Sequence, residues 1–560
     1  MYRGLIHLMW VAGVAVPWAT VATGGLAEEG KPAAATEPAA KKPAKRRPLV
    51  TVSKETTFIT GPLRKDGTVD YVAALNERSS RGVTPENNAV VLLLKAVARA
   101  EIDSKSRERF FKMLGIAPLP EKGSYLESYD AYFERKNPGA TAPKEGQGPD
   151  LSKKRWDESY RIGERPWSKS EFPVAAAWLE ENQKQVDLVV AATKRPRFYV
   201  PLVVPPDKPE TLISVDLIAV FLPSREAARV LCARAMFRLG AGKVEEAWQD
   251  LLACHRLARL MGQGPTLVDA LVAIAIEGIA IHGDVVLAHE GKLTAEQAQR
   301  FAAEFRQLPP MGKMADKINW AERFFCLDCV EMATKEGPAQ LLAYGDIVGG
   351  GKNRWAWLIN AMARVFVDWD EPMRIGNQWY DRVVAALSKP THKERATAVA
   401  DLEHDLKQMS KEARDLRAIL RSALSSGSLR FALSRMLAQT LVSDFLPALS
   451  AAMNAEERDI TYQNMVPVVF ALAAYRADRG AYPAELAALV PQYLPAIPED
   501  LFSGGPFRYK REGAGYVLYS VGPNGKDDGG RNYMDEPDSE KNRGCDDIAI
   551  HVPLLERSRL

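Results

Sequence analysis

The side chains best suited to chemistry lie in one acidic loop near the C-terminus. Residues 522–548 are rich in Gly, Asn and Asp, which tolerate turn conformations, and contain almost no apolar residues to close the loop. Ca²⁺ prefers six to eight hard oxygen ligands, which carboxylates and backbone carbonyls supply, and a bound cation removes the repulsion between neighbouring carboxylates. The acidic residues of this loop are Asp527, Asp528, Asp535, Glu536, Asp538, Asp546 and Asp547. The alternative is a solvated acidic loop balanced by Lys526, Arg531, Lys541 and Arg543.

The elements before this loop are a helix and a hairpin. A helix over residues 454–479 ends at Gly480, and Tyr482 is expected to be extended because it precedes a proline. Residues 507–510 and 516–521 have strand composition, with turn residues at 513–515 between them. The acidic loop therefore follows a helix and two short strands.

This succession resembles the C-terminal globular domain of the type II secretion pseudopilin G. The matching residues are Tyr475, Gly480, Tyr482, Pro483, Asp500, Tyr519, Ser520, Gly522, Gly525, Asp546, Asp547 and Ile548. The resemblance implies a small α+β module over residues 454–560 and a loop that binds Ca²⁺ through acidic side chains and backbone carbonyls, ending at an Asp-Ile step. In this chain it implies Asp528, Asp546 and Asp547 as the metal ligands.

Two departures from that family bear on function. The helix before the module lies deep in the chain and carries the charged run Glu456, Glu457, Arg458 and Asp459, so it is unsuited to assembly as a pilin stem. The acidic-Gly pair that usually follows the last strand is replaced by Pro523-Asn524-Gly525. The module is therefore expected to be a borrowed domain without a role in pilus assembly.

A second group of ionisable residues lies on the apolar segment 266–289. At about 100° per residue, Asp269, Glu277 and Asp284 fall on one side of a helix, and His282 and His289 lie nearly opposite. Such acids could bind a metal or act as an acid/base pair. The favoured interpretation is that they mark the solvated edges of an Ala-rich helix. The chain lacks an HExxH motif, so a zincin is not indicated.

The cysteine and glycine motifs favour ordinary packing. Cys326 and Cys329 form a CxxC string within a predicted helix, away from the helix N-terminus that a redox pair requires. Cys232 and Cys254 are expected to be neighbours across a helical hairpin, without a disulfide. The glycine-rich residues 345–353 are interpreted as a loop because the spacing and Asn353 do not fit a phosphate-binding motif.

The N-terminus has the layout of a secretory signal. Arg3 precedes a mostly apolar run at residues 5–22, and small residues lie before Glu28, which predicts cleavage after Ala27. An uncleaved membrane anchor is the alternative, since the run approaches spanning length. Residues 28–50, rich in Ala, Pro, Lys and Arg, are expected to be a disordered linker. No internal segment is expected to span a membrane, because Glu277 interrupts the longest apolar run.

The remaining chain is expected to be mainly helical. We predict an α-rich region at 51–216, including helices that start at Thr84 and span 174–191, and a helical domain at 217–453. Residues 224–239 and 244–261 form a predicted tetratricopeptide-like hairpin without a second copy. Apolar residues in heptad spacing predict a bundle helix or a coiled-coil contact: Leu402, Leu406, Met409, Ala413, Leu416 and Leu420. Three tryptophans are expected to pack in or at the edge of the core: Trp156, Trp167 and Trp178.

The whole chain indicates an exported, mainly α protein with a small C-terminal α+β module. Its 560 residues, 46% hydrophobic content and formal charge of +3 are typical of a globular protein without nucleic acid as its main partner. We predict a non-enzymatic structural or interaction protein in the periplasm or outside the cell, with a protein partner in the cell envelope and a membrane contact only if the signal is uncleaved. The alternative is an extracytoplasmic hydrolase whose acidic and histidine residues converge from the helical domain.

Overall fold

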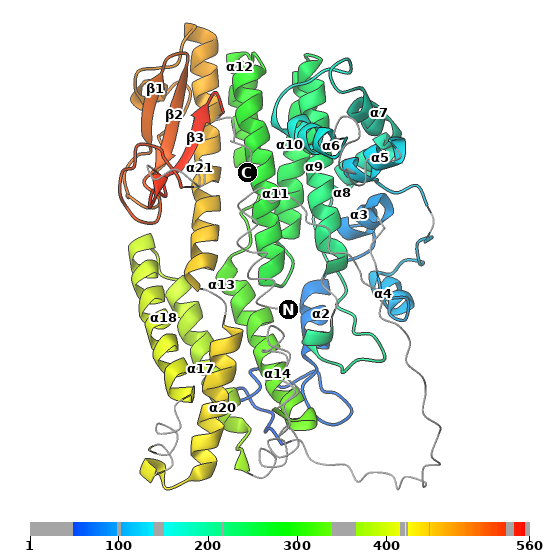
Figure 1. The fold of residues 1–560 in the computed structure, drawn as a ribbon, viewed down its shortest axis with the longest axis vertical. Helices are drawn as coiled ribbons and strands as arrows, with labels where there is room; N and C mark the ends of the chain where they lie inside the picture. The colour runs from blue at the N-terminus through cyan, green and yellow to red at the C-terminus, as the bar shows by residue number, and fades with distance from the viewer. Residues whose placement is uncertain are drawn as a thin grey trace, which may run out of the picture.

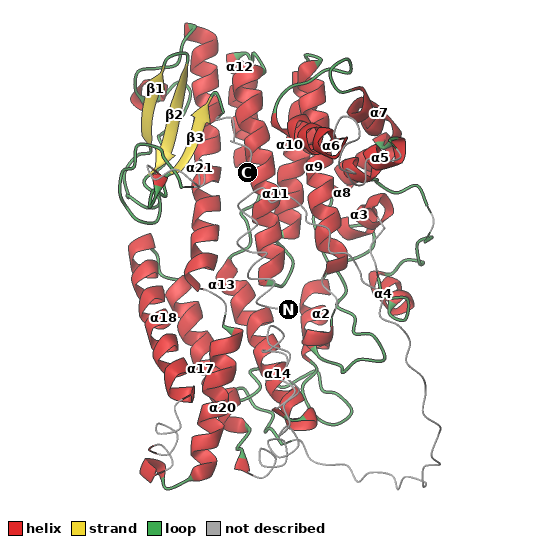
Figure 2. Cartoon of the chain, viewed as in Figure 1, coloured by secondary structure: helices red, strands yellow, loops and turns green. Residues whose placement is uncertain are grey.

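The computed structural model describes residues 49–97, 102–121, 123–137, 151–215, 218–338, 366–414, 421, 424–446, 449–533 and 542–554. These residues form a tall helical assembly with one small antiparallel sheet near the C-terminus (Figure 1, Figure 2). This confirms the predicted mainly α class with a C-terminal sheet. The signal, most of the linker, the loop at 345–353, and Leu416 and Leu420 lie outside the described residues.

Short helices form the N-terminal part of the chain. Their bounds are α2 Tyr71–Ser80, α3 Ala89–Val97, α4 Arg107–Leu114, α5 Tyr129–Lys136, α6 Leu151–Glu164, α7 Pro173–Glu181 and α8 Gln183–Thr193. Helix α3 starts five residues after Thr84, because residues 84–88 form a turn in which Asn88 pairs with the backbone of Arg197. The predicted helix 174–191 is two helices with a break at Asn182.

Long helices form the centre of the molecule. They are α9 Ile218–Gly240, α10 Val244–Met261, α11 Leu267–Glu290, α12 Ala295–Arg306, α13 Met314–Lys317 and α14 Arg323–Glu336, with a π-helical turn at Ile318–Glu322. Helices α9 and α10 are the predicted hairpin, closed by Gly242 at a φ of 74°. Helix α11 starts where Thr266 and Asp269 form a reciprocal capping box.

Four further helices complete the left-hand side of Figure 1. Their bounds are α17 Asp370–Leu387, α18 His392–Arg414, α20 Leu429–Phe445 and α21 Leu449–Arg479. Leu402, Met409 and Ala413 on α18 are buried, and the first two share a hydrophobic cluster with α17 and with residues 442–453. The described part of the heptad pattern is therefore a bundle contact within the chain.

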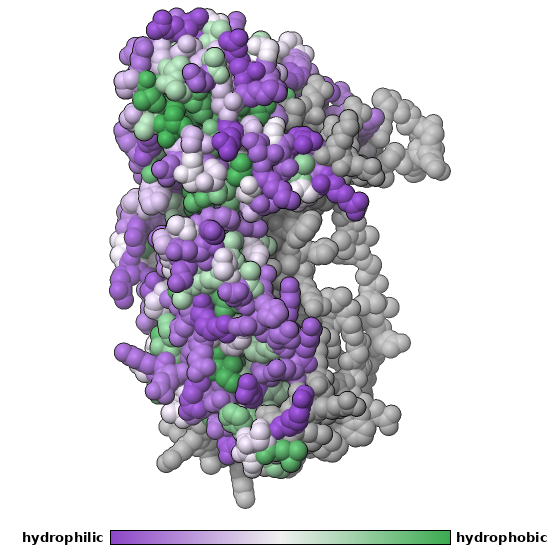
Figure 3. Space-filling model, turned by 90° about the vertical axis from the view of Figure 1, so that its left-hand side faces the viewer, coloured by the Kyte–Doolittle hydropathy of each residue, from purple (hydrophilic) through white to green (hydrophobic). Residues whose placement is uncertain are grey.

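The C-terminal sheet packs beside the upper half of α21 (Figure 1). Its strands are β1 Arg508–Glu512, β2 Gly515–Ser520 and β3 Ile548–Val552, in the order β1-β2-β3. Strand β2 pairs antiparallel with both neighbours, placing Leu518 opposite Tyr509 and Ile550. The surface that carries the sheet and α18 is mostly hydrophilic, with hydrophobic residues only in small groups (Figure 3).

The hydrophobic cores cross the predicted domain boundaries. One cluster includes Val90 on α3, Trp248 on α10 and Leu518 on β2, so residues from all three predicted folded regions share it. A second cluster joins Val50 to α2, α14 and residues 202–212. Val50 is only 5% exposed, so the predicted linker ends before it.

Helix α11 is the most apolar long helix of the described chain. By length and composition it could cross a membrane, although 67% of its apolar stretch is buried inside the protein. Glu277 lies within this helix and is buried. The structure shows a buried core helix, which meets the same requirements of length and apolarity.

Candidate metal centre

The loop between β2 and β3 brings three distant aspartates together. It leaves the sheet through Gly522 and returns to it at Ile548. Asn532 forms an antiparallel bridge with Asp546, and the backbone N–H of Tyr533 donates to the carbonyl of Cys545 at 3.0 Å. These contacts close the neck of the insert, so that Asp528 on one side meets Asp546 and Asp547 on the other.

The three carboxylates form a compact group. One oxygen atom from each of Asp528, Asp546 and Asp547 lies within 4.8 Å of the others. Asp547 is fully buried, and Asp528 and Asp546 are half-buried. Oδ1 of Asp546 and Oδ1 of Asp547 are buried with no hydrogen-bond partner among the described residues. Buried polar atoms are normally satisfied, so these two oxygens are free to accept a further partner, and the group could hold a metal ion.

The other carboxylate oxygens are held by backbone amides. Oδ2 of Asp547 accepts from the N–H groups of Gly530 at 2.7 Å and Asp528 at 3.1 Å. Oδ2 of Asp546 accepts from the N–H of Asn524 at 3.0 Å. Each of these two carboxylates is thus oriented through one oxygen and keeps the other free.

Burial and mutual repulsion make this group electrostatically costly. Burial raises the pKa of Asp547 to about 6, since it and the charges of Asp528 and Asp527 outweigh the two amide hydrogen bonds. Burial also raises the pKa of Asp546. Divalent cations reverse such costs, and flexible cages of hard oxygens suit Ca²⁺. The predicted ligand residues are therefore brought together in a geometry that fits a cation.

Among the described acids of the loop, Asp527 does not belong to this group. Asp527 accepts from the hydroxyl of Tyr519 at 3.0 Å and lies 3.6 Å from the guanidinium of Arg508. Asp535, Glu536 and Asp538 lie outside the described residues. The described metal group consists of Asp528, Asp546 and Asp547.

The acidic residues of α11 are not solvated, contrary to the favoured interpretation. Asp269, Glu277 and Asp284 are at most 5% exposed. Asp269 caps its own helix, whereas Glu277 and Asp284 flank the imidazole of His255 on α10, at 3.0 Å and 2.8 Å. Sequence reasoning missed His255 because its partners lie on another helix.

The cluster around His255 extends to α21. Arg259 lies 2.6 Å from Glu277 and donates to Gln463, which donates to Asp459 at 2.6 Å. Burial lowers the pKa of His255, but Glu277 and Asp284 outweigh it and raise that pKa to about 9. The side chains of His255, Glu277 and Asp284 are 0% exposed, so in this structure a substrate cannot touch them. Acidic and histidine side chains do converge, as the hydrolase alternative requires, but they form a buried contact between α10 and α11.

The two histidines of α11 make separate contacts. Nε2 of His282 lies 2.9 Å from Glu164 at the end of α6. Nδ1 of His289 lies 3.2 Å from the hydroxyl of Tyr482, to which Arg476 donates at 2.8 Å. The second contact joins the C-terminal module to α11.

The cysteines are buried, and none of them forms a disulfide in the described part of the chain. Cys326 and Cys329 lie within α14, as predicted for packing residues. Cys232 and Cys254 both contact backbone carbonyls of α11, at Ile279 and Ile276, so they face the same interface. Among the tryptophans, Trp167 and Trp178 are core residues, and Trp156 is 38% exposed and stacks on Tyr160.

Comparisons of the chain with protein-family models, with curated proteins and with solved structures gave no match.

Proposed function

We propose that this chain is an exported, non-enzymatic structural or interaction protein whose C-terminal module binds one Ca²⁺ ion. The ligands are the carboxylates of Asp528, Asp546 and Asp547, completed by backbone carbonyls of the same loop. The observation that carries this proposal is the pair of buried, unpartnered oxygens on Asp546 and Asp547. The resemblance of the module to pseudopilin G supports the same metal and the same loop.

The ion would have a structural role. The loop between β2 and β3 has a small apolar content, and its neck is held by few backbone bonds. A cation shared by three carboxylates joins both sides of that neck and offsets their repulsion. The module is joined to the helices through the contact between Tyr482 and His289. A closed loop would keep the surface of this module in one shape, which a partner in the cell envelope could bind.

Thermal unfolding of the full chain tests the proposal. Millimolar Ca²⁺ should raise the melting temperature of the wild-type protein, because a ligand that binds only the folded state stabilises it. Asp546→Ala should abolish that increase. Glu485→Gln, which changes an exposed acid of the same module, is the matched control and should keep it.

Two results would count against the proposal. One is an equal Ca²⁺-induced increase in wild type and Asp546→Ala, which would place the ion elsewhere. The other is that neither Ca²⁺ nor Mg²⁺ raises the melting temperature of the wild type or of either variant. The loop would then be a solvated acidic segment.

Export is a separate part of the proposal. Its support is the N-terminal signal layout at residues 1–27. N-terminal sequencing of protein recovered outside the cytoplasm should begin at Glu28. Recovery of intact protein in the membrane fraction, starting at Met1, would instead identify residues 5–22 as an anchor.

A further inference from the structure

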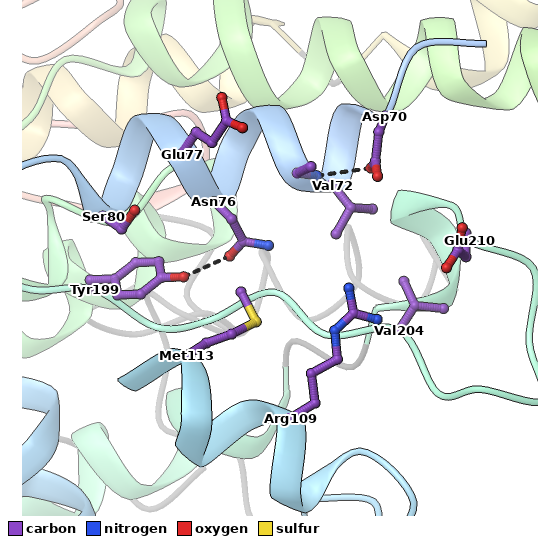
Figure 4. A pocket seen from close by; sticks show the side chains of 11 residues that line it. Asp70, Val72, Asn76, Glu77, Ser80, Arg109, Met113, Tyr199, Val204 and Glu210 are labelled. Carbon is purple, nitrogen blue, oxygen red and sulfur yellow. Dashed lines mark hydrogen bonds between the residues drawn. The ribbon is translucent and has the colours of Figure 1, made fainter. Parts of the chain in front are cut away.

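A cleft of about 370 Å³ lies between α2, α4 and the segment 199–210. Figure 4 shows α2 along one wall and Arg109 of α4 extending into the space from the opposite wall. Its volume lies near the lower end of the range typical of small-ligand sites. The cleft is remote from the metal centre, being formed by N-terminal elements.

The walls of this cleft are fixed by buried hydrogen bonds. Oδ1 of Asn76 accepts from the hydroxyl of Tyr199 at 3.0 Å and from the N–H of Leu202 at 2.9 Å. Its amide donates to the carbonyl of Leu202 at 2.8 Å. These bonds hold the segment 199–204 against α2. The ion pair of Lys105 with Asp207, at 2.7 Å, joins the residues just before α4 to the same segment. The cleft is therefore preformed.

The charges along the cleft are unequal. Asp70, Glu77 and Glu210 contribute three carboxylates, and Arg109 contributes one guanidinium. One oxygen of Asp70 caps α2 by accepting from the N–H of Ala73. Within the described part of the chain, the side chains of Arg109, Glu77 and Glu210 make no hydrogen bond or ion pair. The lining thus favours a cationic ligand and still presents one free donor group.

The floor of the cleft is apolar. Val72 and Val204 are buried there, and Met113 is half-buried beside Arg109. Aliphatic stems of lysine and arginine pack on such a surface while their charged ends stay near carboxylates. A polyamine would satisfy the carboxylates but would leave the donors of Arg109 unused. A dicarboxylate would be repelled by the net charge.

We infer that this cleft binds an extended basic peptide segment of a partner protein. Its Lys or Arg side chains pair with Asp70 and Glu210, its aliphatic groups contact Val72 and Val204, and its backbone carbonyls accept from Arg109. This inference does not depend on calcium binding, since none of these residues belongs to the C-terminal module.

Fluorescence anisotropy with the full chain tests the inference. The probe is a labelled, end-blocked hexapeptide of alternating lysine and valine, compared with its glutamate-for-lysine counterpart. Wild type should bind only the lysine peptide, and added salt should weaken binding because the charges are exposed. The double variant Asp70→Asn/Glu210→Gln should bind at least tenfold more weakly. Asparagine retains the cap of α2, so the fold is preserved.

Two single variants sharpen the result. Glu108→Gln removes an exposed acid of α4 that does not line the cleft and should leave the affinity unchanged. Arg109→Met should weaken binding of the peptide but leave binding of spermine equal or stronger. Tighter binding of the peptide by Arg109→Met would overturn the inference, because the cleft would then act only as a negative patch.

Further outcomes would also overturn it. Equal affinity of wild type and the double variant would place the peptide elsewhere on the surface. The chain has its own basic residues before the described region, namely Lys41, Lys42, Lys45, Arg46 and Arg47. If replacing these five by serine increases the affinity for the added peptide tenfold or more, these residues compete with the peptide. The occupant of the cleft is then a segment of this chain and not a partner protein.

Discussion

Nε2 of His255 lies 2.8 Å from Oδ2 of Asp284, and both side chains are completely buried. The opposite ring nitrogen faces Glu277 at 3.0 Å. A carboxylate beside each nitrogen favours the doubly protonated imidazolium, and the raised pKa of His255, about 9, agrees with this. The pair joins α10 to α11 at the centre of the molecule.

Removal of His255 should destabilise the fold strongly. His255→Gln leaves Glu277 and Asp284 without a cation between them, and breaking a buried pair in this way costs about 3–5 kcal/mol. Urea unfolding measures the change in the free energy of unfolding. His404→Gln, an exposed histidine on α18, is the control and should stay within about 0.5 kcal/mol of wild type. Equal stabilities for the two variants would contradict this account of the cluster.

The same cluster predicts a loss of stability in alkaline solution. The folded-state pKa of His255 is raised from 6.5 to about 9, so its contribution is complete below pH 6.5 and is lost as the pH rises through 9. The charged groups around it are Glu277 and Asp284 from α11, Arg259 from α10 and Asp459 from α21. Wild type should therefore lose a few kcal/mol of unfolding free energy between pH 6.5 and 9. His255→Gln should show a nearly flat profile across this window.

Gly522 offers a steric test of the metal loop. It has a φ of 63°, and a Cβ there would lie 2.2 Å from the carbonyl oxygen of Asp546. Gly525 has a φ of 68°, but a Cβ at that position meets nothing within 4 Å. Gly525→Ala should cost only the left-handed penalty of about 1–2 kcal/mol. Gly522→Ala should cost more and should also abolish the Ca²⁺-induced rise in melting temperature, which Gly525→Ala should retain.

Acid should compete with calcium at the candidate centre. The pKa of Asp547 is raised from 3.8 to about 6, so without metal the folded state loses stability as the pH rises through this interval and the buried carboxylate ionises. Calcium requires the ionised form. Calorimetric titration should therefore show weaker Ca²⁺ binding at pH 5 than at pH 7. An affinity that is the same at both pH values would exclude Asp547 as a ligand.

Local helix signals were sufficient to predict some of the helices but not all of their bounds. Thr266 starts α11 because its hydroxyl and the carboxylate of Asp269 satisfy free amides at the helix N-terminus, a pattern contained within four residues. Thr84 makes similar bonds with Asn87, yet the helix begins later. There the backbone of Asn88 pairs with Arg197, a distant contact that no local pattern contains.

The sites depended on contacts between segments far apart in the sequence. Helical spacing correctly placed Glu277 and Asp284 on one side of α11. It could not show that the side is buried, because the compensating His255 and Arg259 lie on α10. The three aspartates of the loop were predicted from a family resemblance. Their ligand oxygens lie within 4.8 Å of one another because backbone contacts close the base of the insert. The residue types alone do not determine that closure.

A crystal structure of the full chain grown with Ca²⁺ tests the central claim most directly. The account predicts an anomalous difference peak between the carboxylates of Asp528, Asp546 and Asp547, with ligand oxygens at about 2.3–2.6 Å. The peak should be missing in crystals of Asp547→Asn grown under the same conditions. An ordered loop at saturating calcium with no peak among these three carboxylates, or the same peak in Asp547→Asn, would contradict the account.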